Sequence, residues 1–124
     1  NSLEAIMMQK LFDSELKVMD FIWAHEPISA KELSILADKE FGWNKNTTYT
    51  VIKKIEAKGY IKRTDPGFIC VSLISKKDVC ESETQTLIDK LFGGSRKALF
   101  SALIEDEKLT KDEIEELRKL IDKR

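Results

Sequence analysis

The chain has 124 residues, of which 42% are hydrophobic and 35% charged, and its formal net charge is −1. This composition is typical of a globular protein and excludes collagen-like, low-complexity and disulfide-scaffold classes. No apolar run approaches the roughly 20 residues of a transmembrane helix, so we expect no membrane insertion. The two cysteines, Cys70 and Cys80, are too few for a secreted disulfide framework. With no secretory signal pattern in the sequence, this favours a cytoplasmic protein.

The charge is unevenly distributed along the chain. Residues 1–43 carry a net charge of −4 and residues 76–124 a net charge of −1. Residues 44–75 contain six Lys and Arg but only two Asp and Glu, which gives +4. A local basic segment is the electrostatic signature of a nucleic-acid contact. A solvated lysine-rich helix face would give the same count, so charge alone does not decide between the two.

Apolar periodicity predicts two helices in the first third of the chain. Asp13 is expected to cap the first, and Pro27 ends it. Ser29 and Glu32 have the spacing of a capping box at the start of the second. Gly42 is expected to end that helix in a left-handed conformation.

A third helix and a β-hairpin follow. The helix is expected to start at Asn46 or Thr47, and its predicted buried stripe comprises Val51, Ile52 and Ile55. Residues 60–64 and 68–74 are rich in aromatic and β-branched side chains, which favour strands. The turn sequence Asp-Pro-Gly at residues 65–67 lies between them and predicts the hairpin.

The last third of the chain predicts three more helices. The fourth ends at Gly93-Gly94, and the fifth is marked by Ala98, Leu99, Ala102 and Leu103. Thr110 with Glu113 forms a capping box that opens the sixth. The expected fold is mostly α with a small β-hairpin wing. We expect two domains, residues 1–75 and residues 76–124, and predict that both cysteines are small core residues.

Three helices followed by a hairpin is the order of a winged helix-turn-helix, whose third helix lies in the DNA major groove. The third helix opens with short hydrogen-bonding side chains. Asn can pair with adenine, and a Thr methyl group can contact the methyl group of thymine. Lysines around them would bind phosphate and set the register. The candidate DNA-binding residues are Lys45, Asn46, Thr47, Thr48, Tyr49, Thr50, Lys53, Lys54 and Arg63.

Two other classes of function are weighed against DNA binding. The sequence has no phosphate-binding glycine motif, and its single histidine, His25, with two scattered cysteines gives no catalytic constellation. These residues also cannot form a four-ligand metal site within one chain, so we expect no cofactor and no metal. A winged helix that binds protein is the other alternative, and the basic third helix argues against it. Helix caps and solvated lysines remain the plain explanation of each feature taken singly.

Several motifs together resemble the penicillinase-repressor family over about residues 11–124. They are Ser-Glu-Leu-Lys-Val-Met-Asp-Phe-Ile-Trp at 14–23, Asn-Thr-Thr-Tyr-Thr-Val-Ile-Lys-Lys-Ile at 46–55, Lys-Gly-Tyr-Ile at 58–61, Phe-Gly-Gly at 92–94 and the ending at 109–124. The resemblance implies a dimeric winged-helix repressor that binds palindromic operator DNA and controls β-lactam-resistance genes. It also implies a membrane-bound sensor-protease as a partner, which cuts the repressor in its dimerisation domain.

Matched residue by residue, the family's operator-reading helix falls on Asn46–Lys54 and its scissile bond on Ala102–Leu103. The best-known members are cut at an Asn-Phe pair, so this chain departs from the family there. The turn between its wing strands is also short. A copper-responsive branch of the family carries a Cys-x-Cys motif that this chain lacks. A family repressor that answers another signal, such as a metal or cell-envelope stress, remains the alternative.

The apolar content after residue 78 is too large for three short helices to bury alone. A second copy of the chain would cover it in a two-fold symmetric interface. Packing of these helices on the wing domain is the alternative. The candidate dimerisation residues are Leu87, Ile88, Leu91, Phe92, Leu99, Phe100, Leu103, Ile104, Leu117 and Ile121.

Overall fold

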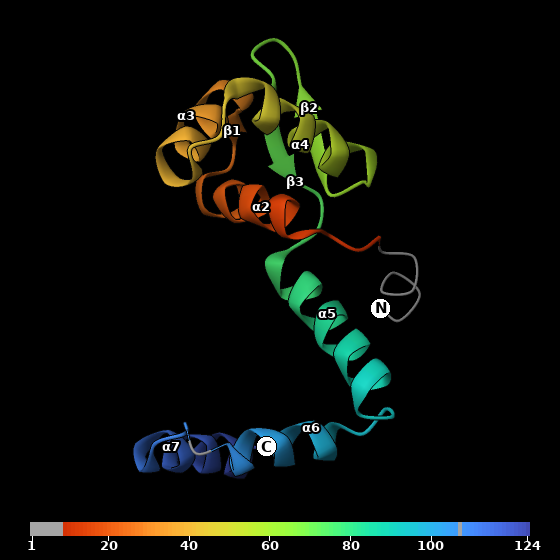
Figure 1. Cartoon of the computed structure of the whole chain (residues 1–124), viewed down its shortest axis with the longest axis vertical. Helices are drawn as coiled ribbons and strands as arrows, with labels where there is room; N and C mark the ends of the chain where they lie inside the picture. The colour runs from red at the N-terminus through yellow and green to blue at the C-terminus, as the bar shows by residue number, and fades with distance from the viewer. Residues whose placement is uncertain (1–8, 107) are drawn as a thin grey trace. The chain divides into compact units, whose positions relative to one another are not determined.

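The structure is a computed structural model that describes residues 9–106 and 108–124 (Figure 1). The chain divides into two units, Asn1–Ser82 and Glu83–Arg124, and the division falls within helix α5 (Lys76–Leu91). The boundary expected after residue 75 lies earlier than this division. The difference arises because Val79, in the first turn of α5, is buried in the core of the first unit.

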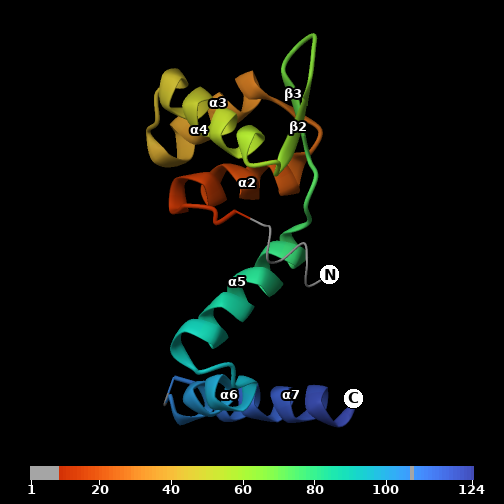
Figure 2. The ribbon, with the colours of Figure 1, turned by 90° about the vertical axis from the view of Figure 1, so that its right-hand side faces the viewer.

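In the described part of the first unit, three helices and a small sheet precede the start of α5, and the three helices and the hairpin of the sheet were predicted (Figures 1 and 2). The helices are α2 (Asp13–His25), α3 (Ala30–Phe41) and α4 (Lys45–Ala57). Each is amphipathic and turns its apolar stripe towards one shared core. The most deeply buried apolar side chains of this core are Val18, Met19, Ile22, Ala30, Leu33, Ile52, Ile55 and Cys70.

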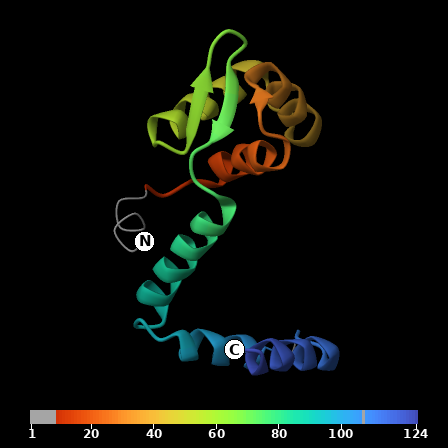
Figure 3. The same cartoon turned by 180° about the vertical axis from the view of Figure 1, so that it is seen from behind.

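The sheet is antiparallel, with strand order β1-β3-β2 (Figure 3). The predicted hairpin is confirmed as β2 (Ile61–Thr64) and β3 (Ile69–Ser72), in which Arg63 lies opposite Cys70. Strand β1 (Ile28–Ser29) pairs with the other edge of β3 and was not predicted. It has only two residues, too few to show the alternation by which a strand is detected in sequence.

Capping side chains fix where α2 and α3 begin. The prediction that Asp13 caps α2 is wrong, because Phe12 is the capping residue and Glu15 accepts a hydrogen bond from its N–H at 2.7 Å. The Ser29 hydroxyl caps α3 as predicted, accepting from the N–H of Glu32 at 3.1 Å. Gly42 ends α3 with a φ of 71°, the left-handed conformation expected there.

Helix α4 begins one to two residues earlier than predicted. Its capping residue is Asn44, whose side-chain oxygen accepts a hydrogen bond from the N–H of Thr47 at 2.8 Å. Lys45 is therefore the first helical residue, and Asn46 is free of the capping role that the sequence alone allowed it.

A buried ion pair ties the end of α4 to the start of α2. The Glu15 side chain is 1% exposed, and its Oε1 lies 2.6 Å from Lys58 Nζ. Lys58 also donates to the carbonyl of Lys10 at 2.9 Å. The second Glu15 oxygen, Oε2, is buried without a hydrogen-bond partner among the described residues. The charge of Lys58 thus balances a buried carboxylate at the carboxyl end of α4.

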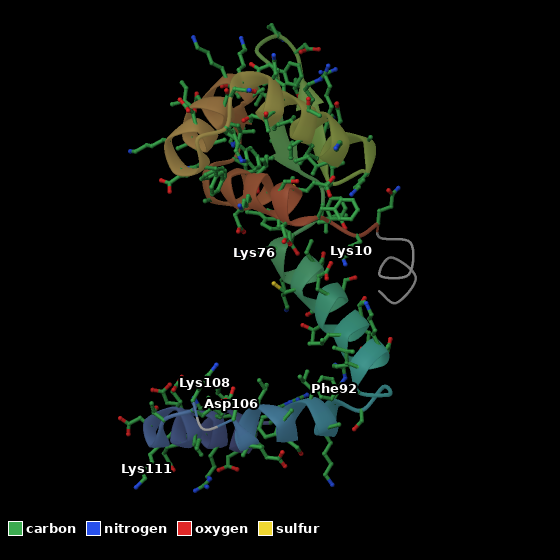
Figure 4. All side chains as sticks on the ribbon, in the orientation of Figure 1. Lys10, Lys76, Phe92, Asp106, Lys108 and Lys111 are labelled. Carbon is green, nitrogen blue, oxygen red and sulfur yellow. The ribbon has the colours of Figure 1, made fainter. Side chains whose placement is uncertain are left out.

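The first turn of α5 is joined to α2 by polar contacts and by packing. Trp23 donates its indole N–H to the carbonyl of Ile74 at 3.0 Å, just before α5 begins. Lys76, labelled at the start of α5 in Figure 4, lies 3.0 Å from the Asp20 carboxylate. With Val79 buried beside them, these contacts make the start of α5 part of the first unit.

The second unit comprises the rest of α5, with α6 (Arg96–Glu105) and α7 (Lys111–Asp122). The predicted capping box of α7 is confirmed: the Thr110 hydroxyl accepts from the N–H of Glu113 at 3.1 Å, and the Glu113 carboxylate accepts from the N–H of Thr110 at 3.0 Å. Neither α6 nor α7 contains a buried residue in the described chain.

The two cysteines differ in environment. Cys70 is fully buried, as predicted, and burial raises the pKa of its thiol to about 11, with a smaller contribution from Glu56. The same prediction for Cys80 is wrong, since Cys80 is exposed on α5. It lies next to the buried Val79, and a helix turns consecutive residues to different sides.

Among the described helices, none combines the length and the apolar character needed to cross a bilayer.

Candidate nucleic-acid interface

Helix α4 has two opposite faces. Its inner face consists of Thr48, Val51, Ile52 and Ile55, all buried against the core. At 100° per residue, the exposed residues Asn46, Thr50, Lys53 and Ala57 lie on the opposite side, and the exposed Lys54 lies at its edge. We call Asn46, Thr50, Lys53 and Lys54 the polar face of α4. It holds two positive charges and no acid, so it suits a polyanion.

The two small residues of the polar face offer different chemistry. Thr50 donates its hydroxyl proton to the carbonyl of Asn46 at 2.8 Å. The hydroxyl is therefore unavailable as a donor to a ligand, while its oxygen still accepts and its methyl group is exposed. The Asn46 side chain makes no hydrogen bond within the described residues, so its amide can both donate and accept. Such an amide matches the paired acceptor and donor of adenine in the major groove.

The cations near α4 fall into two groups. Lys45, Lys53, Lys54 and Lys62 are exposed and have no ion-pair partner in the part of the chain that the structure describes. Lys58 and Arg63 are engaged inside the protein, Lys58 with Glu15 at 2.6 Å and Arg63 with Glu56 at 3.5 Å. The first group is free to bind phosphate, whereas the second is held by the fold.

The structure separates the predicted DNA-binding residues accordingly. Lys45, Asn46, Thr47, Thr50, Lys53 and Lys54 are exposed on α4. Thr48 is fully buried, and its hydroxyl lies 3.4 Å from the Asn44 carbonyl, so it belongs to the core and we remove it from the interface. Tyr49 on α4 and Arg63 on β2 are half-buried, and each contacts the ring of Phe68.

Lys62 is an exposed cation of the wing that the predicted DNA-binding residues did not include, whereas they included Arg63. Alternation in β2 decides between them: Ile61 is buried, so Arg63 shares its side of the strand and Lys62 lies on the solvent side. The signal was present in the sequence, because an apolar residue at 61 predicts an inward side chain at 63.

In the second unit, apolar side chains are left exposed. Of the ten predicted dimerisation residues, Ile88 is buried, and Phe92, Leu99 and Leu117 are half-buried. The remaining six, with Leu120, are exposed large hydrophobic residues of 38–66% accessibility: Leu87, Leu91, Phe100, Leu103, Ile104 and Ile121. Ala102 and Leu103, the matched scissile pair, both lie exposed within α6.

Comparison with known proteins gives this arrangement its context. The family model described as "Penicillinase repressor" matches residues 11–123. This chain belongs to the penicillinase repressor family. The family consists of DNA-binding transcriptional repressors and not of enzymes, and the winged-helix prediction is confirmed.

Individual family members cover the chain to different extents. The methicillin resistance regulatory protein MecI of Mammaliicoccus sciuri is 29% identical over 117 residues, 93% of this chain and 95% of its own. The solution structure of the DNA binding domain of the repressor BlaI matches 57% of this chain and 89% of its own, with 27% identity and a TM-score of 0.53. The monomeric form of Bacillus licheniformis BlaI, solved in complex with the blaP half-operator, matches the same shares with 27% identity and a TM-score of 0.51.

Proposed function

We propose that this chain is a homodimeric repressor that binds a palindromic operator through α4 and controls β-lactam-resistance genes. The observation that carries the proposal is the polar face of α4, where Asn46 and Thr50 stand between Lys53 and Lys54 with no acid among them. The core lies on the opposite side of the helix, so the polar face is free to enter a major groove.

Roles within the polar face follow from its chemistry. Asn46 has a free amide and Thr50 an exposed methyl group, so these residues read bases. Lys53 and Lys54 bind phosphate, together with Lys62 on the wing, and contribute affinity without sequence preference. Bacillus licheniformis BlaI, whose structure resembles this one, was solved on a half-operator, and this supports a DNA duplex as the partner.

Dimerisation is supported by the second unit. Helices α6 and α7 bury no residue, while Leu103, Ile104 and Leu120 are about half exposed. A second copy covers such faces in a two-fold symmetric interface, and that symmetry matches a palindromic operator. Two linked winged helices then bind with the second half-site at high effective concentration.

Release from DNA is proposed to follow proteolysis of α6 at or near Ala102–Leu103 by a membrane sensor-protease. Helix α6 has ten residues and none of them is buried. Isolated helices below roughly 12–15 residues are marginal in water, so α6 can open locally and present an extended strand to a protease. A cut there separates Leu99 from α7 and divides the apolar surface that a partner would cover.

Base-reading and phosphate-binding roles are tested by mobility shift at two salt concentrations. The probe is a palindromic duplex selected by the wild-type protein from a random pool, with a scrambled duplex as control. Asn46→Ala and Thr50→Ala are expected to weaken selected-site binding by about 1–3 kcal/mol each and to leave scrambled-site binding unchanged. Lys53→Ala is expected to weaken both and to reduce the salt slope by about one. Equal effects of all three changes on both duplexes would contradict the assignment.

The cleavage proposal has its own test, which is mass spectrometry of the repressor recovered from β-lactam-treated cells. Fragments that end at Ala102 are expected. Intact chains recovered while the regulated genes are expressed would refute proteolysis, whereas fragments that end elsewhere would refute only the position of the cut.

A further inference from the structure

Phe68 has an unusual backbone conformation for its residue type. It lies between the wing turn and β3 and has a φ of 56°. Among the described non-glycine residues, Phe68 is the only one with a positive φ. Glycine and asparagine adopt this conformation readily, whereas a bulky aromatic residue is disfavoured in it. A phenylalanine at such a position therefore calls for contacts that hold it there.

The ring of Phe68 lies between α4 and β2. Its centroid is 5.7 Å from that of the Tyr49 ring, and the Arg63 guanidinium lies 4.1 Å from it on one face. Arg63 is in turn 3.5 Å from the Glu56 carboxylate, and Lys45 Nζ lies 5.4 Å from the Tyr49 ring. These five side chains form a continuous row of contacts in the order Lys45, Tyr49, Phe68, Arg63 and Glu56. The row connects the first turn of α4 to the wing and ends on α4 again, at Glu56.

The backbone of Phe68 makes a third connection. Its carbonyl accepts the N–H of Ala30, the first residue of α3, at 2.9 Å. One residue therefore contacts α3 through its carbonyl, and α4 and β2 through its ring. Phe68 therefore connects the end of the wing turn to both α3 and α4, in addition to the pairing of the hairpin strands.

We propose that Phe68 is a positioning residue for DNA binding: it fixes the wing against α4, so that Lys62 and the polar face of α4 meet one duplex at the same time. The inference rests on the proposed function of α4. Phe68 acts through its neighbours and need not touch DNA. Arg63 contacts both the Glu56 carboxylate and the Phe68 ring, so it helps to hold the wing against α4.

The test uses the full chain and the duplex that the wild-type protein selects from a random pool. Phe68→Gly removes the ring at a position whose positive φ glycine adopts without steric strain. The variant is therefore expected to keep a cooperative unfolding transition. Its affinity for the selected duplex is expected to fall about tenfold, and its salt slope by about one, as one phosphate contact is lost. Phe68→Tyr keeps the ring and is expected to bind within about twofold of wild type.

A double-mutant cycle distinguishes positioning from general loosening of the fold. Lys62→Ala is expected to weaken binding in the wild-type background and to have no further effect beside Phe68→Gly. The matched control Lys53→Ala, on α4 itself, is expected to cost the same in both backgrounds. If Phe68→Gly does not fold, Phe68→Leu replaces it in the cycle with the same expectation.

Three results would overturn the proposal: wild-type affinity in Phe68→Gly, no effect of Lys62→Ala in the wild-type chain, or the same cost of Lys62→Ala in both backgrounds. A wild-type protein that selects no duplex would instead refute the proposed function on which the inference rests, so the two failures are distinguishable.

Discussion

The helices of residues 1–82 and those of residues 83–124 meet solvent in different ways. Val18, Met19 and Ile22 of α2 are wholly buried, whereas α6 and α7 bury nothing and expose Leu103 and Leu120 by 53% and 60%. Burying an apolar side chain of this size stabilises a fold by about 1.5–3 kcal/mol. The winged-helix unit therefore carries its own stability, whereas we propose that the second unit takes part of its stability from a second copy.

Thiol labelling gives the largest expected contrast within the winged-helix unit. Cys80 is exposed, while Cys70 is buried and its pKa is raised to about 11, so its thiolate is scarce at neutral pH. Labelling of Cys70 requires opening of the core, which costs about 5 kcal/mol or more, so it should be slower than labelling of Cys80 by a factor of roughly 4,000 or more. The measurement is the rate of reaction with an aromatic disulfide at pH 8. Comparable rates for both thiols would mean that the first unit has no stable core.

The buried ion pair offers the next largest effect. Lys58→Ala leaves the Glu15 carboxylate 1% exposed without its counter-charge. The free energy of unfolding should fall by about 3 kcal/mol, near the lower end of the cost of breaking a buried pair. Urea titration followed by circular dichroism measures it. Lys54→Ala, an exposed lysine on the same helix, is the matched control and should change stability by less than about 0.5 kcal/mol.

Leu103→Asp tests the second unit, where Leu103 lies exposed on α6. A charge placed on the exposed apolar surface of α6 should weaken dimerisation by about 2 kcal/mol, roughly 30-fold in dimer dissociation constant, and leave the winged-helix unit folded. Sedimentation over a range of concentrations measures the shift. Ser101→Asp, a neighbouring change outside the predicted dimerisation set, is the control. A monomeric wild-type chain at micromolar concentration would contradict the dimer itself.

The smallest effect is expected at the start of α7. Thr110→Ala removes one half of the capping box and should cost about 1 kcal/mol of helix stability. If α7 is stable only when paired, this loss should appear as a lower helix content that recovers as protein concentration rises. Ser29 caps α3 in the winged-helix unit, so the cost of Ser29→Ala should not depend on protein concentration.

Much of the winged-helix unit could be predicted from the sequence because its signals are local. Ser29 and Gly42 bound α3 by caps that depend on a few neighbouring residues, and Val51, Ile52 and Ile55 repeat at helical spacing. Thr48 was predicted to bind DNA but is fully buried. The spacing that buries Val51 and Ile52 also places residue 48 inside, but its hydroxyl suggested an exposed polar role.

Other features depend on contacts between residues far apart in the chain. Strand β1 exists because two residues meet an edge of β3, about 40 positions later. The engagement of Arg63 by Glu56 and Phe68, and of Lys58 by Glu15, likewise follows from tertiary packing. The same is true of any surface that a second copy would cover, so the dimerisation residues and the scissile bond remain predictions.

Under the proposed function, the first unit binds DNA and the second unit pairs two copies of the chain. The most direct test measures how tightly the full chain and a fragment of residues 1–82 bind one operator half-site and the full palindrome. We expect the fragment and the full chain to bind the half-site with affinities within about threefold, because both contain α4 and the wing. On the palindrome only the full chain should gain, by at least about 100-fold, through pairing of its second unit. A folded fragment that fails to bind the half-site, or a full chain that gains nothing on the palindrome, would contradict the account.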